Sequence, residues 1–266
     1  MRRIQFIEFH DQSWFPSFLR DYITDALQFG FDRFGIYAHI APLLQRALDS
    51  TQNTTIVDMC SGGGGPWLDL SRRLDSPSSA KDSPALQIYL TDKYPNLEAF
   101  QKISAASDGR VRFNSEPVDA TNVPRELKGF RTMFSTFHHF RPAEARAIIQ
   151  DAVNAREGIG IFEVARRAPL TIAMTSVFVL MLFVATLGMR PFRWARLFWT
   201  YLIPVIPFVL LFDGVVSCLR TYRPEELHQI VAQLAVSGYH WEIGEHRVSK
   251  ALITYLIGYP QAGPVR

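Results

Sequence analysis

Apolar residues recur along this chain with two different periods, and their alternation predicts an α/β fold. Short runs rich in β-branched and aromatic residues predict buried strands, whereas apolar residues spaced three and four apart predict helices. We expect strands in TTIVDM, LQIYLTD, RVRFNS, GFRTMFSTF and GIGIFEVA, and helices in 12–50, PWLDLSRRL, PNLEAFQKISAA and RPAEARAIIQDAVN. Pro66 is expected at the first position of its helix. The composition of residues 75–84 predicts a loop.

Strands that alternate with helices form right-handed crossovers and hence a mostly parallel sheet. Near the end of the chain, RPEELHQIVAQLAVSG predicts a helix that ends at Gly238, and YHWEIGEHRV and SKALITYLIGYP predict an antiparallel strand pair. The sequence therefore predicts a Rossmann-like sheet with an antiparallel edge. We expect three parts: an N-terminal helical lid (1–50), the sheet domain (51–165 and 222–266) and an apolar helical insertion (166–221).

The insertion departs from the pattern of a soluble domain. Residues 168–189 contain no charged residue in 22 positions, and as a helix they would be about 33 Å long, close to the thickness of a bilayer core. The second apolar run, 197–212, is shorter and is interrupted by Pro204 and Pro207. We expect membrane association through 168–219.

The mode of that association has alternatives. A hairpin across the bilayer would carry Arg190, Arg193 and Arg196 to the far side, against the positive-inside tendency. A hairpin that dips into one leaflet or lies along it is therefore favoured, with the catalytic domain in the cytoplasm. A full two-pass span, and a hydrophobic subdomain buried by folding or by a dimer partner, stay open.

Composition and charge narrow the remaining classes. The 266 residues have a net charge of only +3 and no long basic run, so no nucleic-acid partner is expected. Cys60 and Cys218 fit no zinc motif and no disulfide framework, which favours a reducing compartment and predicts no metal site. The N-terminus lacks the apolar segment of a signal peptide. The oligomeric state cannot be predicted.

A glycine-rich turn follows the first strand, in TIVDMCSGGGGPW. Glycines at a strand-to-helix turn permit a tight turn and let backbone N–H groups approach a ligand. Asp92 ends the second strand, where an acid can accept both hydroxyls of a ribose, and Asp119 follows the third strand. No phosphate-binding P-loop motif is present.

This order of motifs resembles the class I S-adenosylmethionine-dependent methyltransferases over about residues 50–165 and 222–258. Asp58 stands at the acid of the family's first motif, and Gly62 and Gly64 fill two glycine positions. Cys60 stands where the first glycine is usual, a departure that fits the family's turn if its φ is negative. The segments DQSWFPSFLRD, CSGGGGPW and SCLRTYRPEEL also resemble a narrower bacterial group of membrane-associated methyltransferases.

The resemblance implies S-adenosylmethionine as the cofactor. Asp58 and the turn would face its methionine part, Asp92 and the adjoining Lys93 its ribose, and Asp119 with Ala120 its adenine. The residues implied in the turn are Cys60, Ser61, Gly62, Gly63 and Gly64. The alternatives for the glycine turn are a purely structural tight turn or an NAD site. The alternative for Asp119 is a capping role.

Candidate catalytic residues follow the fourth and fifth strands. His138 or His139 is a candidate general base, because an imidazole titrates near neutral pH. The alternative is that one histidine lies on the surface and the other caps the next helix. Glu163, at the end of the fifth strand, can orient a substrate or anchor the insertion.

These observations predict a methyltransferase at the cytoplasmic face of a membrane, acting on a hydrophobic small molecule or lipid. Two competing hypotheses remain. One is a membrane scaffold or interaction protein whose cofactor domain does not catalyse. The other is methylation of a protein partner.

Overall fold

The computed structural model describes residues 1–74, 85–190, 192–248 and 251–261, and the predicted loop 75–84 lies outside them. The chain forms two compact units. Residues 35–164 and 224–266 make up the sheet unit, and residues 1–34 and 165–223 the helical unit. The first boundary therefore lies at Phe34 and Gly35, where the sequence analysis placed it at residue 50.

The sheet unit has seven strands in the order β3-β2-β1-β4-β5-β7-β6. The first five are parallel, and β7 runs antiparallel between β5 and β6. The expected fold class and antiparallel edge are confirmed. The strands are β1 (Thr55–Asp58), β2 (Gln87–Leu90), β3 (Val111–Phe113), β4 (Phe130–Phe134), β5 (Ile159–Glu163), β6 (Tyr239–Val248) and β7 (Ala251–Pro260).

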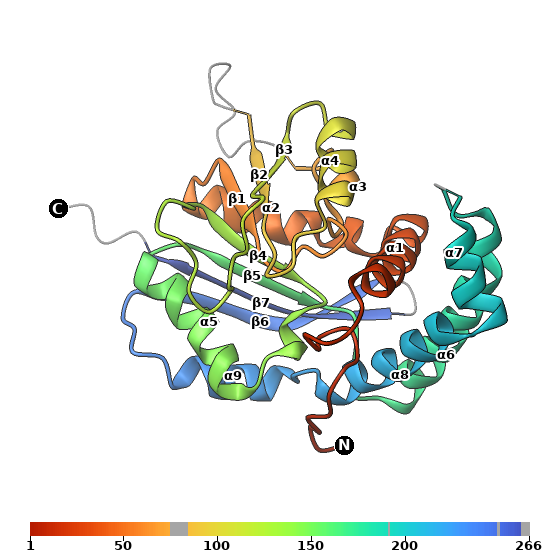
Figure 1. The fold of residues 1–266 in the computed structure, drawn as a ribbon. Helices are drawn as coiled ribbons and strands as arrows, with labels where there is room; N and C mark the ends of the chain where they lie inside the picture. The colour runs from red at the N-terminus through yellow and green to blue at the C-terminus, as the bar shows by residue number, and fades with distance from the viewer. Residues whose placement is uncertain (75–84, 191, 249–250, 262–266) are drawn as a thin grey trace. The chain divides into compact units, whose positions relative to one another are not determined.

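Helices cover both faces of this sheet, with α5 and α9 on one face and α2 on the other (Figure 1). Strands β4 and β5 are buried at every position, including the polar residues Arg131 and Thr132 of β4 and Glu163 of β5. The helical elements are η1 (Ile36–Ile40), α2 (Ala41–Thr51), α3 (Trp67–Leu70), α4 (Leu97–Ala106), η2 (Phe137–His139), α5 (Pro142–Ala155) and α9 (Pro224–Ala232).

Two predicted helix boundaries were wrong. The helix after the glycine turn begins at Trp67, directly after Pro66, and lasts only four residues. Helix α9 ends at Ala232, because the next residues form tight turns from Gln233 N–H to the Ile230 carbonyl and onward. Gly238 has a φ of 72°, so it turns the chain into β6 and does not cap the helix.

The helical unit contains α1 (Ser17–Phe34), α6 (Pro169–Ala185), η3 (Thr186–Gly188), α7 (Trp194–Leu197), the π-helical turn η4 (Phe198–Leu202) and α8 (Val205–Arg220). Its core joins side chains of α1, such as Ile23 and Ala26, to Leu182 of α6 and Val209 of α8. By length and composition the stretch Pro169–Gly188 could cross a membrane. The segments 194–202 and 205–220 could do so only as one broken span, because they meet at 71°.

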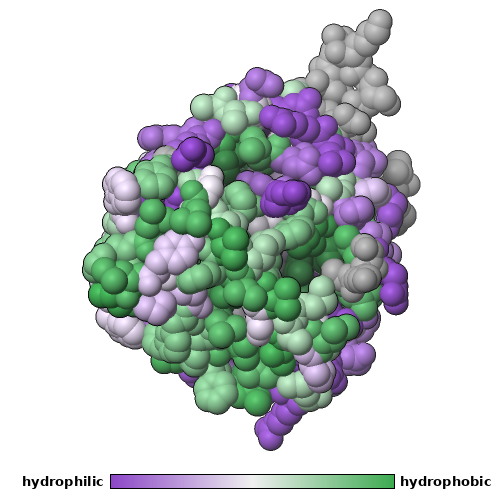
Figure 2. Space-filling model, turned by 90° about the vertical axis from the view of Figure 1, so that its right-hand side faces the viewer, coloured by the Kyte–Doolittle hydropathy of each residue, from purple (hydrophilic) through white to green (hydrophobic). Residues whose placement is uncertain are grey.

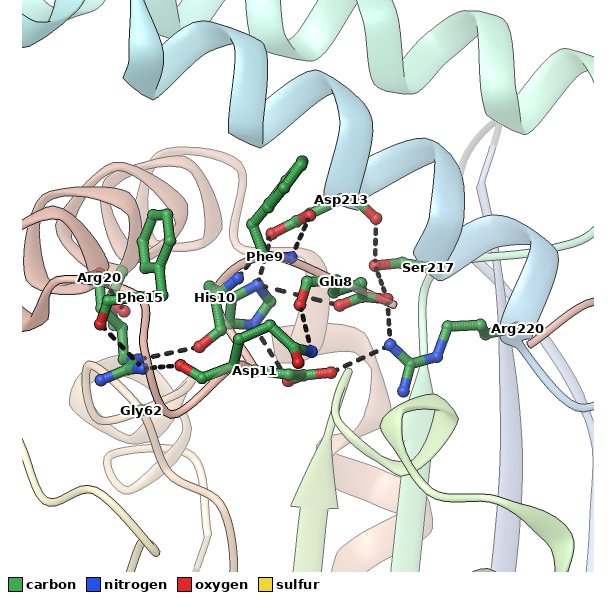
Figure 3. A network of polar contacts seen from close by, with 12 residues as sticks. Glu8, Phe9, His10, Asp11, Phe15, Arg20, Gly62, Asp213, Ser217 and Arg220 are labelled. Atoms are coloured by element: carbon green, nitrogen blue, oxygen red, sulfur yellow. Dashed lines mark hydrogen bonds and ion pairs between the residues drawn. The ribbon is translucent and has the colours of Figure 1, made fainter. Parts of the chain in front are cut away.

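The N-terminal segment is attached to α8 by a network of polar contacts (Figure 3). Arg220 Nη1 forms ion pairs with Glu8 Oε1 at 3.1 Å and with Asp11 Oδ2 at 3.0 Å. Asp213 Oδ2 accepts the backbone N–H of His10 at 3.1 Å and lies 2.9 Å from His10 Nδ1. Glu8, Asp213 and Arg220 are buried, so this network is an internal part of the helical unit.

Candidate functional site

The predicted site residues gather along the carboxyl ends of β1, β2, β4 and β5, all within the sheet unit (Figure 1). This is the edge where ligands bind in open parallel sheets. Asp58 ends β1, and it pairs in register with Leu90 of β2 and with Thr132 of β4. Glu163 ends β5. The sheet therefore brings residues that are far apart in sequence to one edge.

The glycine turn has left-handed backbone at Gly62, Gly64 and Gly65, with φ values of 54°, 105° and 56°. At Gly64 a β-carbon would also lie 1.9 Å from Cδ1 of Ile103 in α4, so packing within the chain excludes a side chain there. Gly63 is buried within the turn. The turn itself therefore favours glycine at Gly62, Gly64 and Gly65, whether or not a ligand lies beside it.

The sequence analysis made the fit of Cys60 to the family's turn depend on a negative φ, and the structure does not meet that condition. Its φ is 56°, a left-handed conformation that costs a non-glycine residue about 1 kcal/mol. A glycine at this position would be free of that cost, and it is the residue that the resembling family usually has there. Cys60 is half-buried in the structure.

Asp58 is a fully buried carboxylate held by neutral donors. Its Oδ1 accepts the hydroxyl of Thr132 at 2.6 Å, and its Oδ2 accepts the hydroxyl of Ser61 at 2.7 Å. Among the described residues, no arginine, lysine or histidine forms an ion pair with it. Burial therefore raises the pKa of Asp58 to about 7, with the two hydroxyl hydrogen bonds opposing the shift and the nearby charge of Asp92 adding to it.

Asp92 contacts the glycine turn directly. Its Oδ2 accepts the backbone N–H of Gly62 at 2.8 Å, and its Oδ1 accepts that of Tyr94 at 2.8 Å. An ionised carboxylate has about four lone-pair sites, so each oxygen can accept a further hydrogen bond. Asp92 is half-buried, which leaves it accessible to a ligand at the sheet edge.

Asp119 and Lys93 form an exposed pair beside this turn. Lys93 Nζ lies 3.1 Å from Asp119 Oδ2, while Oδ1 accepts the hydroxyl and the backbone N–H of Thr121 at 2.6 and 2.9 Å. The Thr121 hydrogen bonds, followed by Lys93, lower the pKa of Asp119. The neighbouring Ala120 is buried. A local turn-forming role for Asp119 is therefore present in the structure.

His138 and Glu163 form a buried pair at the ends of β4 and β5. His138 Nδ1 lies 2.6 Å from Glu163 Oε2, and Glu163 Oε1 accepts the backbone N–H of Phe137 at 2.7 Å. The ring of His139 is only partly buried and lies 4.3 Å from that of His138 between centroids. Helix α5 begins at Pro142, and the backbone N–H of its N-cap residue, Arg141, is donated to Glu144 Oε2.

Tyr37 and Ser135 belong to the same edge, and the sequence analysis missed both. Tyr37 Oη lies 2.5 Å from Ser135 Oγ, although the residues are 98 positions apart. Burial raises the pKa of Tyr37, and the charges of Glu163 and Asp58 add to that shift, so the phenol lies near both carboxylates. Ser135 has a φ of 49°, a strained value for a non-glycine residue.

No single-residue pattern marks Tyr37 in the sequence. Its ring packs edge-on against Phe134 at 5.0 Å between centroids, and Phe134 stacks on Phe162 at 5.2 Å. Trp67 packs edge-on against Phe134 from the other direction. These rings therefore form one aromatic cluster beside the polar residues that follow β4 and β5.

Comparisons with known proteins show the fold of this chain, but they do not show a family. The sequence matches no protein-family model, and no curated protein matches it. Solved structures share the fold at low identity, and three of them are described here. An O-methyltransferase family protein from Burkholderia thailandensis aligns with a TM-score of 0.51 and 17% identity, over 90% of this chain and 60% of that chain.

The other two structures contain ligands. PigF with SAH aligns with a TM-score of 0.52 and 15% identity, over 94% of this chain and 62% of that chain. The O-methyltransferase NcsB1 from neocarzinostatin biosynthesis, in complex with S-adenosylmethionine and 2-hydroxy-5-methyl naphthoic acid, aligns with a TM-score of 0.50 and 14% identity, over 87% and 55% of the two chains. Our chain thus spans less than two thirds of the length of these proteins, and the likeness shows the fold alone.

Proposed function

We propose that this chain is an S-adenosylmethionine-dependent methyltransferase that acts on a hydrophobic hydroxyl-bearing acceptor at the cytoplasmic face of a membrane. The observation that carries the proposal is the buried Asp58 carboxylate beside the glycine turn, which no cation of the described chain neutralises. S-adenosylmethionine has an ammonium and a sulfonium group, and either supplies the missing charge. Two of the three solved structures described above contain S-adenosylmethionine or SAH.

The donors and acceptors at the edge fit such a cofactor. Asp58 and the turn around Gly62 would hold the methionine part, and the remaining lone pairs of Asp92 would accept the ribose hydroxyls. Asp119 and Ala120 would border the adenine. The exposed pair between Lys93 and Asp119 is worth little energy, so its rearrangement on binding costs little.

The pair of His138 and Glu163 supports transfer to oxygen. With a proton on Nδ1 directed at Glu163 Oε2, which lies 2.6 Å away, His138 would use Nε2 as the base that takes a proton from an acceptor hydroxyl. The bound cofactor supplies an already activated methyl group. The protein's part is to hold the acceptor in line, remove its proton and exclude water.

The helical unit supports a hydrophobic acceptor and a membrane location. Most side chains of α6 that face outward are apolar, and Leu170, Val177 and Leu180 are each more than 60% exposed. A soluble monomer rarely exposes so many large apolar side chains on one helix. A lipid-dissolved acceptor would reach an enzyme that is attached to the same membrane.

The test uses purified protein, methyl-labelled S-adenosylmethionine and a membrane extract from the source cells. After reaction the label is partitioned between organic, aqueous and protein fractions. We expect label in the organic fraction that disappears in Asp92→Ala and persists in Asp69→Ala, which removes an exposed carboxylate of α3. Label in protein would instead favour a protein acceptor. Binding of the cofactor without any transfer would favour the non-catalytic scaffold.

A further inference from the structure

One face of α6 is apolar from end to end. The outward positions at spacings of three and four are Leu170, Ala173, Val177, Leu180, Val184 and Leu187, which we call the outer stripe. Its five larger members are 61–69% exposed. Trp194, at the start of α7, is 78% exposed, and Leu202 of η4 is 72% exposed. Apolar side chains gather over these helices in the space-filling view (Figure 2).

The charge of the helical unit complements an anionic surface. Residues 1–34 and 165–223 contain eleven arginines, no lysine and six carboxylates, a net charge of +5, although the whole chain has only +3. Arg166 precedes α6, and the exposed Arg190 follows the end of the outer stripe. Basic residues at the border of an apolar helix face are typical of helices that lie on anionic bilayers.

The neighbours of α6 count against a span through the bilayer core. Thr175 is near the middle of α6, and its Oγ1 lies 3.6 Å from Sγ of Cys218 in α8. A β-carbon on Gly214 of α8 would lie 2.7 Å from Cγ2 of Thr175. The middle of α6 is therefore level with the half of α8 that contains Asp213 and Arg220. Those side chains, with Glu8 and Asp11, form the polar network of Figure 3.

The other neighbour of α6 leads to the same conclusion. A β-carbon on Gly30 of α1 would collide with Phe178, and the rings of Phe34 and Phe178 lie 6.2 Å apart. Asp32 and Arg33, which are exposed, lie between these two contacts in sequence. If α6 crossed a membrane, these charges would enter the hydrocarbon, where ionised side chains are expensive.

We propose that the helical unit docks on a single leaflet of an anionic bilayer, with α6 lying in the membrane plane and the outer stripe at the boundary of headgroups and acyl chains. Trp194 and the exposed Arg190 would lie at headgroup level, a common place for such side chains. This inference rests on the membrane location in the proposed function and adds the partner's chemistry and the mode of contact.

The first test measures flotation of the full chain with sealed vesicles of phosphatidylcholine, alone or with phosphatidylglycerol. We expect binding to increase at least tenfold with the anionic lipid and to fall at high salt. Val177→Gln with Leu180→Gln should abolish binding, while Leu97→Gln, which replaces an exposed leucine of α4, should not. Arg190→Gln should weaken binding about fivefold, and Arg146→Gln on α5 should leave it unchanged.

The second test distinguishes one leaflet from a span. Arg190→Cys and Lys102→Cys, each in a Cys60→Ser background, are exposed to a membrane-impermeant maleimide outside the vesicles. Equal labelling of both is expected, because both residues would lie on the same side. Protection of Arg190→Cys alone would show a two-pass hairpin and overturn the proposal.

Two further outcomes would also overturn it. Equal binding to neutral and anionic vesicles would exclude headgroup recognition, and no binding with a stable dimer in solution would make the outer stripe an interface between two copies.

Cofactor binding is measured on the same samples without vesicles. Its loss in all variants would count against the proposed function, whereas loss of vesicle binding alone would count only against the docking surface.

Discussion

The two units bury carboxylates in opposite ways. In the helical unit, Glu8 and Asp11 share the guanidinium of Arg220, so the chain supplies the cation itself. In the sheet unit, Asp58 accepts the hydroxyls of Thr132 and Ser61, and no cation from the described residues pairs with it. Both arrangements provide hydrogen-bond donors to the carboxylate, but only the first includes a cation.

The difference indicates which cluster is structural and which is a site. A buried ion pair with its own hydrogen bonds is a closed arrangement, whereas a buried carboxyl with a raised pKa is costly to ionise until a cation arrives. Functional sites are where such costs are common. Asp58 therefore marks the place where a cationic ligand would gain most from binding.

The largest effect is expected from Arg220→Met. The substitution removes the cation from a cluster in which Glu8 has no exposed surface, and breaking such a pair typically costs about 3–5 kcal/mol. Urea unfolding followed by circular dichroism gives the loss. The matched control is Arg46→Met, whose ion pair with Glu242 is exposed, and it should cost less than about 1 kcal/mol. Equal losses of stability in the two variants would mean that burial does not make the ion pairs of Arg220 more stabilising than the exposed pair of Arg46 and Glu242.

Asp58 should make the free protein less stable as the pH rises. Its pKa of about 7 in the folded state lies above its value of 3.8 in an unfolded chain, so the folded state binds the extra proton between these two values. Stability conferred by the neutral acid is complete below pH 3.8, falls through the window and is lost above about pH 7. The total is about 4 kcal/mol at most.

The measurement is urea unfolding from pH 4 to pH 8 for the wild type and for Asp58→Asn. The difference between the two curves should change across this window, because the amide does not titrate. If Asp58 holds the cofactor's ammonium, the affinity for S-adenosylmethionine should rise with pH through about 7 in the wild type and stay flat in the variant. A pH-independent difference in unfolding would show that the folded carboxyl keeps its ordinary pKa.

The pair of His138 and Glu163 offers a further test of the sheet unit, because Glu163 is its second buried carboxylate. Once the labelled acceptor is known, His138→Gln should lower kcat about 100-fold, the lower range for loss of a general base, without weakening cofactor binding. Glu163→Gln should lower kcat less, and His139→Gln should change it little. A His138 variant with full activity would make the pair a purely structural link between the ends of β4 and β5.

The sequence predicted the sheet and the edge because these depend on local patterns. Apolar runs located β1, β4 and β5, and alternation with helices then placed Asp58, Asp92 and Glu163 at one edge. The contact of Tyr37 with Ser135 could not be predicted, because it joins residues 98 positions apart through a short 3₁₀ helix. Its position depends on tertiary packing, on which periodicity carries no information.

The N-terminal segment shows the same limit. Near them in sequence, Glu8 and Asp11 have His10, whose ring nitrogens lie 3.9 and 3.8 Å from their carboxylates. This local pairing gives no sign of a buried arginine partner. Their partner, Arg220, is more than 200 residues away and meets them only after α8 has packed. The left-handed backbone at Cys60 is a further case, because the residue type favours the opposite sign of φ.

Cys60→Gly should have the smallest effect on stability. It tests whether the glycine turn binds its ligand without the side chain of residue 60. Glycine removes a left-handed cost of about 1 kcal/mol but adds freedom to the unfolded chain, so the expected gain in stability is only a few tenths of a kcal/mol. Arg156→Gly is the matched control, because Arg156 has a φ of 58° at the end of α5, on the surface. Both variants are compared by urea unfolding and by calorimetric binding of S-adenosylmethionine.

If the turn holds its ligand by backbone groups and by Asp58, the affinity of Cys60→Gly should stay within about threefold of the wild type, since less than 1 kcal/mol of binding energy changes. A tenfold loss of affinity in Cys60→Gly, with Arg156→Gly unchanged, would mean that the thiol itself contacts the ligand and that the cysteine is part of the site.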